Sequence, residues 1–118
     1  GLNMYDTDRV YELIVEELKE RVDMDDYELE NADEYEEDMM NYEDDIKDCI
    51  LCNNDFDWYG EDGREILAEN ADCYEGHSYE TLARVLTDID FAIDIIWRAR
   101  FDEAIEDLME LFIQNHKS

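Results

Sequence analysis

Residues 79–114 read YETLARVLTDIDFAIDIIWRARFDEAIEDLMELFIQ and include the most apolar part of the chain. Ser78 precedes them, and its hydroxyl can cap the first turn of a helix. Apolar residues then recur every three or four positions, the period of an α-helix. They are Leu82, Val85, Leu86, Ile89, Ile93, Ile96, Trp97, Ala104, Leu108 and Leu111. An unbroken helix would be about 54 Å long. We predict a kink or break near residues 98–102, because Asp102 could cap a new segment.

Two further helical patterns precede this stretch. Residues 7–22 should form a helix capped by Asp6 or Thr7, with a core stripe of Val10, Ile14, Leu18 and Val22. The acidic residues 23–30 should connect it to a second helix. That helix should begin at Asn31, which forms a capping pattern with Glu34, and end near residue 53. Its core stripe is predicted to be Tyr35, Met39, Tyr42, Ile46 and Cys49.

The rest of the chain also favours helices. After a loop at residues 53–63, a short helix over 64–73 should bury Ile66, Leu67 and Ala71. Proline is absent, glycine occurs four times, and no alternating pattern demands a strand. The sequence therefore predicts an all-α fold. We expect one acidic helical domain over residues 1–118, a bundle of about four helices with a long, kinked C-terminal helix.

The C-terminal aromatic residues have two possible roles. Packing in the core is the first expectation, and a dimer interface of a homodimer is the alternative. The residues concerned are Phe91, Trp97, Phe101 and Phe112.

The charge balance limits what the protein can bind. The 118 residues contain 37 acids and 9 bases, a formal net charge of −28. Leu, Ile, Val and Phe together number 28, enough to favour a folded chain over a disordered one. Such a surface repels nucleic acid and anionic membranes, so we expect neither direct nucleic-acid binding nor membrane binding. The pattern contains no leader-like or membrane-spanning segment, and we expect a cytoplasmic protein with a basic partner.

Motifs that carry chemistry are not evident. Cys49 and Cys52 have C-x-x-C spacing, but they end an apolar helical stripe, so these thiols and Cys73 are predicted to be reduced and buried. His77 and His116 have no ligand-spaced neighbours. A calcium loop starting at Asp55 fails because its twelfth residue, Ile66, cannot ligate. We therefore expect no catalytic residue, no metal, no cofactor and no enzymatic activity.

The density of the acids suggests a more specific role. Residues 23–48 hold 14 acids and one lysine. If helical, they would span about 39 Å, or about one net charge per 3 Å, close to the ~3.4 Å per charge of one DNA strand. The whole net charge equals that of about 14 base pairs. We interpret the acids of the first two helices and their connection as phosphate mimics: Glu12, Glu16, Glu20, Asp23, Asp25, Asp26, Glu36, Glu37, Asp38, Glu43, Asp44, Asp45 and Asp48.

The chain resembles the Ocr (overcome classical restriction) antirestriction proteins of bacteriophages. The resemblance covers length, acidity, the first helix DRVYELIVEELKERV, the acidic Asp25-Asp26 connection and the segment DEAIEDLMELF. It implies a helical homodimer that imitates bent duplex DNA, binds type I restriction–modification enzymes and protects phage DNA in the cytoplasm of an infected bacterial host. The chain departs from the family in its cysteines and in its less acidic end, QNHKS.

Other functions share this composition. An immunity protein for a basic nuclease needs a focal patch with aromatic anchors, which Tyr27, Tyr35 and Tyr42 would supply. An anti-CRISPR inhibitor would use DNA mimicry against another nuclease. A chaperone for basic proteins such as histones, or a halophilic protein with a merely solvated surface, would also be acidic.

Overall fold

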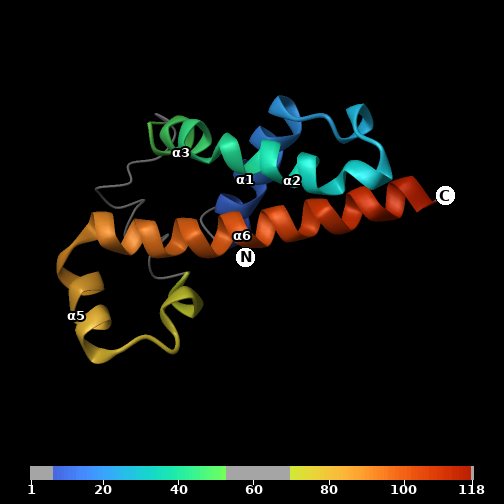
Figure 1. The fold of residues 1–118 in the computed structure, drawn as a ribbon. Coiled ribbons are helices and arrows are strands. Elements are labelled where there is room, and N and C mark those ends of the chain that lie inside the picture. Colours follow the sequence, from blue (N-terminus) through green and yellow to red (C-terminus); the bar gives the residue numbers. More distant parts are fainter. Residues whose placement is uncertain (1–6, 53–69, 118) are drawn as a thin grey trace, which may run out of the picture.

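The computed structural model describes residues 7–52 and 70–117, and this part of the chain is all-α, as predicted. Three 3₁₀ turns accompany its α-helices, and no strand occurs in these two ranges (Figure 1). The α-helices are α1 (Thr7–Arg21), α2 (Ala32–Asn41), α3 (Glu43–Leu51), α5 (Tyr79–Thr87) and α6 (Ile89–Lys117). The 3₁₀ turns are η1 (Met24–Asp26), η2 (Leu29–Asn31) and η3 (Ala71–Tyr74).

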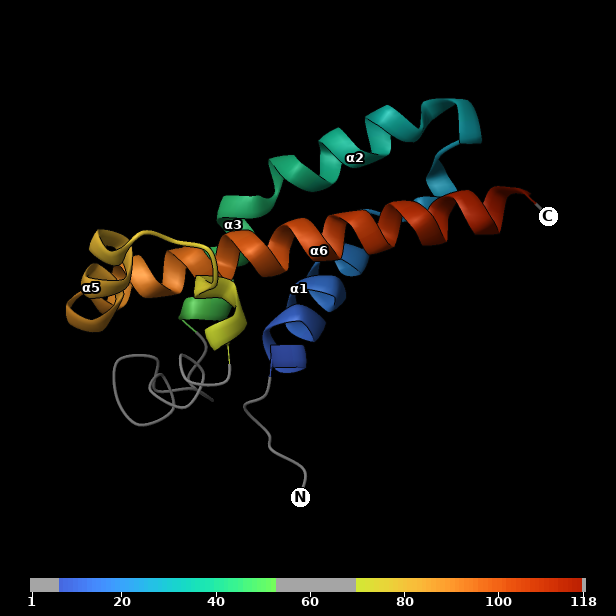
Figure 2. The same ribbon diagram turned by 90° about the horizontal axis from the view of Figure 1, so that it is seen from below.

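Helix α6 is the axis of the molecule. Helix α1 crosses it, and α2 runs beside its C-terminal half (Figures 1 and 2). The predicted stripe of α1, from Val10 to Val22, is buried against it. The same core contains Tyr35, Met39, Ile46 and Ile50 from α2 and α3. Although α6 is 29 residues long, none of the helices in the described ranges has the length and apolar character needed to cross a bilayer.

The C-terminal aromatic residues belong mainly to this core. Trp97, Phe101 and Phe112 are almost completely buried within the single chain. Phe112 stacks on Tyr35 with ring centroids 4.8 Å apart, and Trp97 stacks on Phe101 at 5.6 Å. The prediction of core packing is confirmed for these three residues, so a dimer interface would have to use other side chains. Phe91 is half-buried, and the guanidinium of Arg84 lies 4.1 Å from its ring centroid.

The break in the C-terminal helical stretch lies at Asp88, and the prediction of a break near 98–102 is wrong. Asp88 is extended, and its Oδ1 accepts a hydrogen bond from the Phe91 N–H at 3.2 Å. The carboxylate of Asp102 is paired with Arg98 one turn earlier at 3.2 Å, and α6 continues through this position. Ser78 caps α5 as predicted, accepting from the Thr81 N–H at 3.3 Å.

The second predicted helix is interrupted at Tyr42, where α2 ends and α3 begins. Beyond Ile46, the side chains that face the core differ from the predicted stripe. Ile50 is buried, whereas Cys49 and Tyr42 are exposed, so their predicted places in the core stripe are wrong. Cys52 is exposed as well. Asn31 occupies the N-cap position as predicted, but its side chain makes no capping hydrogen bond.

Some sequence predictions fall partly or wholly outside the described ranges. They concern the Asp6 cap, the loop at 53–63, the calcium pattern at 55–66 and most of the helix at 64–73. The described end of that last segment, Ala71–Tyr74, is the 3₁₀ turn η3.

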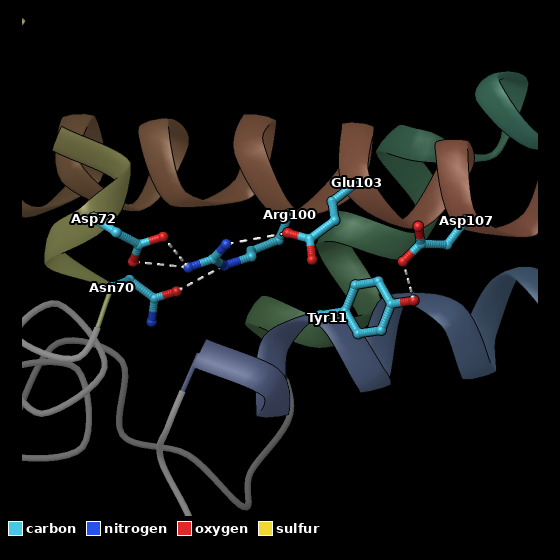
Figure 3. Close-up of polar contacts among 6 residues, drawn as sticks. All are labelled: Tyr11, Asn70, Asp72, Arg100, Glu103 and Asp107. Carbon is cyan, nitrogen blue, oxygen red and sulfur yellow. Dashed lines mark hydrogen bonds and ion pairs between the residues drawn. The ribbon is translucent and has the colours of Figure 1, made fainter. Parts of the chain in front are cut away.

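A buried arginine joins η3 to α6 (Figure 3). Arg100 is 8% exposed, and its Nε donates to Asn70 Oδ1 at 3.0 Å. Its Nη2 contacts both carboxylate oxygens of Asp72 at 2.9 Å, and its Nη1 donates to Glu103 at 3.1 Å. A planar guanidinium is suited to several simultaneous partners, whereas an ammonium is a point charge.

Arg100→Lys should therefore destabilise the protein by about 2 kcal/mol, because a buried ammonium could not keep the simultaneous hydrogen bonds to Asn70, Asp72 and Glu103. Urea unfolding followed by circular dichroism measures this. The matched control is Arg98→Lys, at an arginine whose side chain is 50% exposed, which should change stability by less than about 0.5 kcal/mol. Equal losses in the two variants would contradict a special role for the buried cluster.

Candidate functional site

Most of the predicted phosphate mimics are exposed on the α1–α3 side of the molecule. Eleven of the thirteen have exposed side chains, carried by α1, by the η1 connection and by α2 and α3. We call these eleven residues the acidic array: Glu12, Glu16, Glu20, Asp23, Asp25, Asp26, Glu36, Glu37, Asp44, Asp45 and Asp48.

The acidic array has no internal neutralisation within the described part of the chain. Three of the arginines and lysines there pair with acids outside the array: Arg21 with Glu17, Lys47 with Asp94, and Arg84 with Asp88. Arg98 and Arg100 likewise pair with acids outside the array. No ion pair in the described ranges involves a member of the array, so its negative field is directed at solvent and at any approaching partner.

Local structure fixes the positions of several array members. On α1, Glu12, Glu16 and Glu20 are spaced four residues apart, which places them on one helix face about 6 Å apart along the axis. In the connection, Asp23 accepts a hydrogen bond from the Asp25 N–H at 2.9 Å and caps η1. These carboxylates are thus held by regular structure rather than by a flexible tail.

Two of the thirteen predicted mimics differ from the others, because Asp38 and Glu43 are half-buried and hydrogen-bonded. The Tyr27 hydroxyl donates to Asp38. The Trp97 Nε1–H donates to Glu43 at 3.0 Å, and Arg98 also pairs with Glu43. Both carboxylates stabilise contacts between elements, so the expectation that they are exposed is wrong, and we leave them out of the acidic array.

The charge per length is close to that of DNA. The described residues carry 30 acids and 8 bases, a net charge of −22, and the longest extent of the fold is 46 Å. This is about one charge per 2.1 Å, between the ~1.7 Å per charge of the duplex and the ~3.4 Å of one strand. Composition alone does not give this charge per length, because the charge per length also depends on the longest dimension of the folded molecule.

Sequence reasoning missed a second row of acids. Asp102, Glu106 and Glu110 are exposed on α6 at four-residue spacing, like the row on α1. The signal was present in the sequence, since DEAIEDLME repeats acids with the helix period. The apolar stripe of the same segment is the stronger signal and hides this row.

A polar pocket lies between the end of α1, the connection and the α2–α3 kink. It has a volume of about 380 Å³, and Tyr27, Tyr42, Asp38 and Asp45 contribute to its lining. Tyr35, proposed with them as an aromatic anchor, is 1% exposed and belongs to the core. Of these three proposed anchors, Tyr27 and Tyr42 are therefore the ones that a partner can reach, and Tyr42 is 37% exposed.

The cysteines and histidines do not converge on a common site. The described ranges contain no group of three or more His, Cys, Asp or Glu side chains placed to hold a metal ion. Cys49 and Cys52 are exposed free thiols, and burial raises the pKa of half-buried Cys73. His77 is exposed, and the ring nitrogens of His116 lie 2.8 Å from the carbonyl oxygens of Phe112 and Tyr27.

Comparisons with protein-family models, with curated proteins and with solved structures found no match to this chain.

The Tyr27–Asp38 contact predicts an alkaline dependence of stability. The hydrogen bond to Asp38, together with burial, raises the pKa of Tyr27 to about 12, above the ordinary value of 10. Below pH 10 the stabilisation is fully present. Between pH 10 and 12 the unfolded phenol loses its proton first, so the free energy of unfolding falls.

Tyr27→Phe should lower the free energy of unfolding at pH 7 by about 1 kcal/mol and make the loss between pH 10 and 12 less steep. Urea titrations across this range measure both effects. Tyr79→Phe, at a tyrosine that is 91% exposed, is the control and should leave stability at pH 7 unchanged. An unaltered alkaline slope in Tyr27→Phe would contradict the assignment.

Proposed function

We propose that this protein is a DNA mimic that occupies the basic DNA-binding channel of another protein. The observation that carries the proposal is the acidic array, eleven exposed carboxylates on ordered structure with no ion pair in the described part of the chain. Lysines and arginines that bind phosphates in such a channel would meet carboxylates instead. The protein would act by stoichiometric binding and not by catalysis.

The most specific target is a type I restriction–modification enzyme. This choice rests on the resemblance of the chain to the Ocr proteins, which block such enzymes and protect phage DNA. The setting would then be the cytoplasm of an infected bacterial host. A type I enzyme must bind duplex DNA. A protein with a similar charge per length can therefore compete with that DNA for the same basic surface.

The proposed binding has a characteristic salt dependence. Bringing the acidic array against a basic channel releases counterions, as DNA binding does. With six to ten pairs formed, affinity should fall by about 10³-fold or more between 50 and 200 mM salt. A contact driven mainly by apolar burial would respond much less.

The direct test is displacement of labelled duplex DNA from a type I restriction–modification enzyme. We expect displacement near one protein or one dimer per DNA site, and a steep loss of affinity as salt rises. No displacement even at low salt would exclude this target.

Neutralising part of the acidic array should weaken binding while it stabilises the fold. Glu16→Gln/Glu20→Gln removes a repulsive pair four residues apart, which should raise the melting temperature, yet it should reduce affinity by about fivefold. Competition with duplex DNA and thermal unfolding measure the two effects. The control Glu30→Gln/Glu75→Gln removes two exposed acids outside the array and should change affinity by less than about twofold.

The rival function, neutralising a basic nuclease through a focal patch, is favoured by the pocket lined by Tyr27 and Tyr42. In that case one residue would dominate the binding energy. A loss of more than about 100-fold in Tyr42→Ala or in a single Asp45→Asn variant would contradict the distributed array and support the focal patch.

A homodimer is part of the proposal, and α5 is the element best suited to join two copies. Its sequence YETLARVLT contains one acid and one base, so repulsion between copies is smallest there. Leu86 is 86% exposed and Tyr79 is 91% exposed, although the helix is amphipathic. An antiparallel pairing would place Glu80 of one copy near Arg84 of the other.

Sedimentation should therefore show a species of about twice 14.1 kDa, and Leu86→Ser should convert it to a monomer without unfolding it. Leu29→Ser, at another exposed leucine, is the control. A monomeric wild-type protein at micromolar concentration would contradict the dimer.

A further inference from the structure

An apolar groove lies between α2 and the C-terminal half of α6, which run side by side (Figure 2). Its volume is about 410 Å³. Ile105 and half-buried Met109 lie on α6, and Met40 and Ile113 complete the apolar lining. Met40 is 46% exposed and Ile113 is 38% exposed, so two large apolar side chains face solvent at the groove.

The same groove also carries four exposed acids. Glu36 comes from α2, and Asp102, Glu106 and Glu110 form the row on α6. Within the described ranges, Asp102 pairs with Arg98, and no ion pair involves the other three. No base lines the groove. The groove therefore combines an apolar interior with a negative field to which three carboxylates without an ion pair contribute.

The negative charge of the groove determines which kind of molecule can bind in it. A second copy of the chain seated there would bring eight carboxylates into one interface, and like charges repel at this range. Nucleic acid would be repelled for the same reason. A basic amphipathic segment satisfies both features, because an apolar side chain can enter the groove while flanking lysines or arginines meet the acids.

We propose that this groove is a docking site for a basic amphipathic segment of the partner protein, anchored by an aliphatic side chain between Met40, Met109 and Ile113. The inference rests on the proposed function and adds to it, because it names the chemistry of the partner beside its DNA channel. The acidic array attracts many basic surfaces, whereas an apolar anchor discriminates among them. Burial of that anchor also contributes binding energy that salt does not screen.

Two short lysine-rich peptides of equal length and charge test the groove directly. One carries leucines four residues apart, and the other carries serines at the same positions. The leucine peptide should bind about tenfold more tightly and retain binding at about 0.15 M salt. In ¹³C-methyl spectra the leucine peptide should change the chemical shifts of the methyl groups of Met40 and Met109. The methyl resonance of Met24, which lies outside the groove, should not change.

Met40→Gln/Ile113→Gln should reduce the affinity for the leucine peptide to that for the serine peptide. Both positions are exposed, and thermal unfolding checks that the fold is retained. Leu29→Gln, at a residue that is 43% exposed, is the matched control and should have no effect.

Equal affinities for the two peptides, lost together as salt rises, would overturn the groove inference. A change from dimer to monomer in Met40→Gln/Ile113→Gln would also overturn it, because a second copy would then fill the groove. DNA displacement tests the proposed function separately. If the wild-type protein fails that assay but holds the leucine peptide, the type I restriction–modification target is wrong and the groove stands.

Discussion

The packing of α1, α2 and α3 against the apolar stripe of α6 has to outweigh the mutual repulsion of the acids around it. Ile14, Leu18 and Phe112 are fully buried in this contact. Complete burial of each such side chain contributes about 1.5–3 kcal/mol, whereas a like-charge pair one helical turn apart costs a few tenths of a kcal/mol. The magnitudes explain how one modest core tolerates rows of acids such as the one on α1.

The few bases are placed where they stabilise the fold and leave the acidic array unpaired. Arg100 fixes η3 to α6, and Lys47 links α3 to α6 through Asp94 (2.6 Å). Placed beside the array, the same cations would have reduced repulsion more directly. Their use at contacts between elements leaves the carboxylates of the acidic array without an ion pair in the described ranges, which suits a competitor for a DNA channel.

Local patterns predicted much of the fold, and tertiary contacts decided the rest. Thr7–Arg21 lies within one residue of its predicted bounds, because an i, i+4 stripe and its flanking acids are local signals. The break lies at Asp88 instead of Asp102, although each carboxylate pairs with an arginine four residues earlier, so these local signals do not distinguish the two positions. The kink at Tyr42 shifted the core from Cys49 to Ile50, and no residue type in that segment marks it.

The candidate site was likewise predictable where it depends on local sequence patterns and unpredictable where it depends on tertiary contacts. Helix periodicity identified eleven exposed acids, but it had no means of finding that Asp38 and Glu43 are engaged by Tyr27 and Trp97, the second from 54 residues away. The groove could not be predicted from the sequence either, because Met40 and Ile113 line a common groove only when α2 packs beside α6. Charge attracts a basic partner from a distance and is readable from composition. Discrimination among basic partners depends on shape and apolar contact, which only the packed helices create.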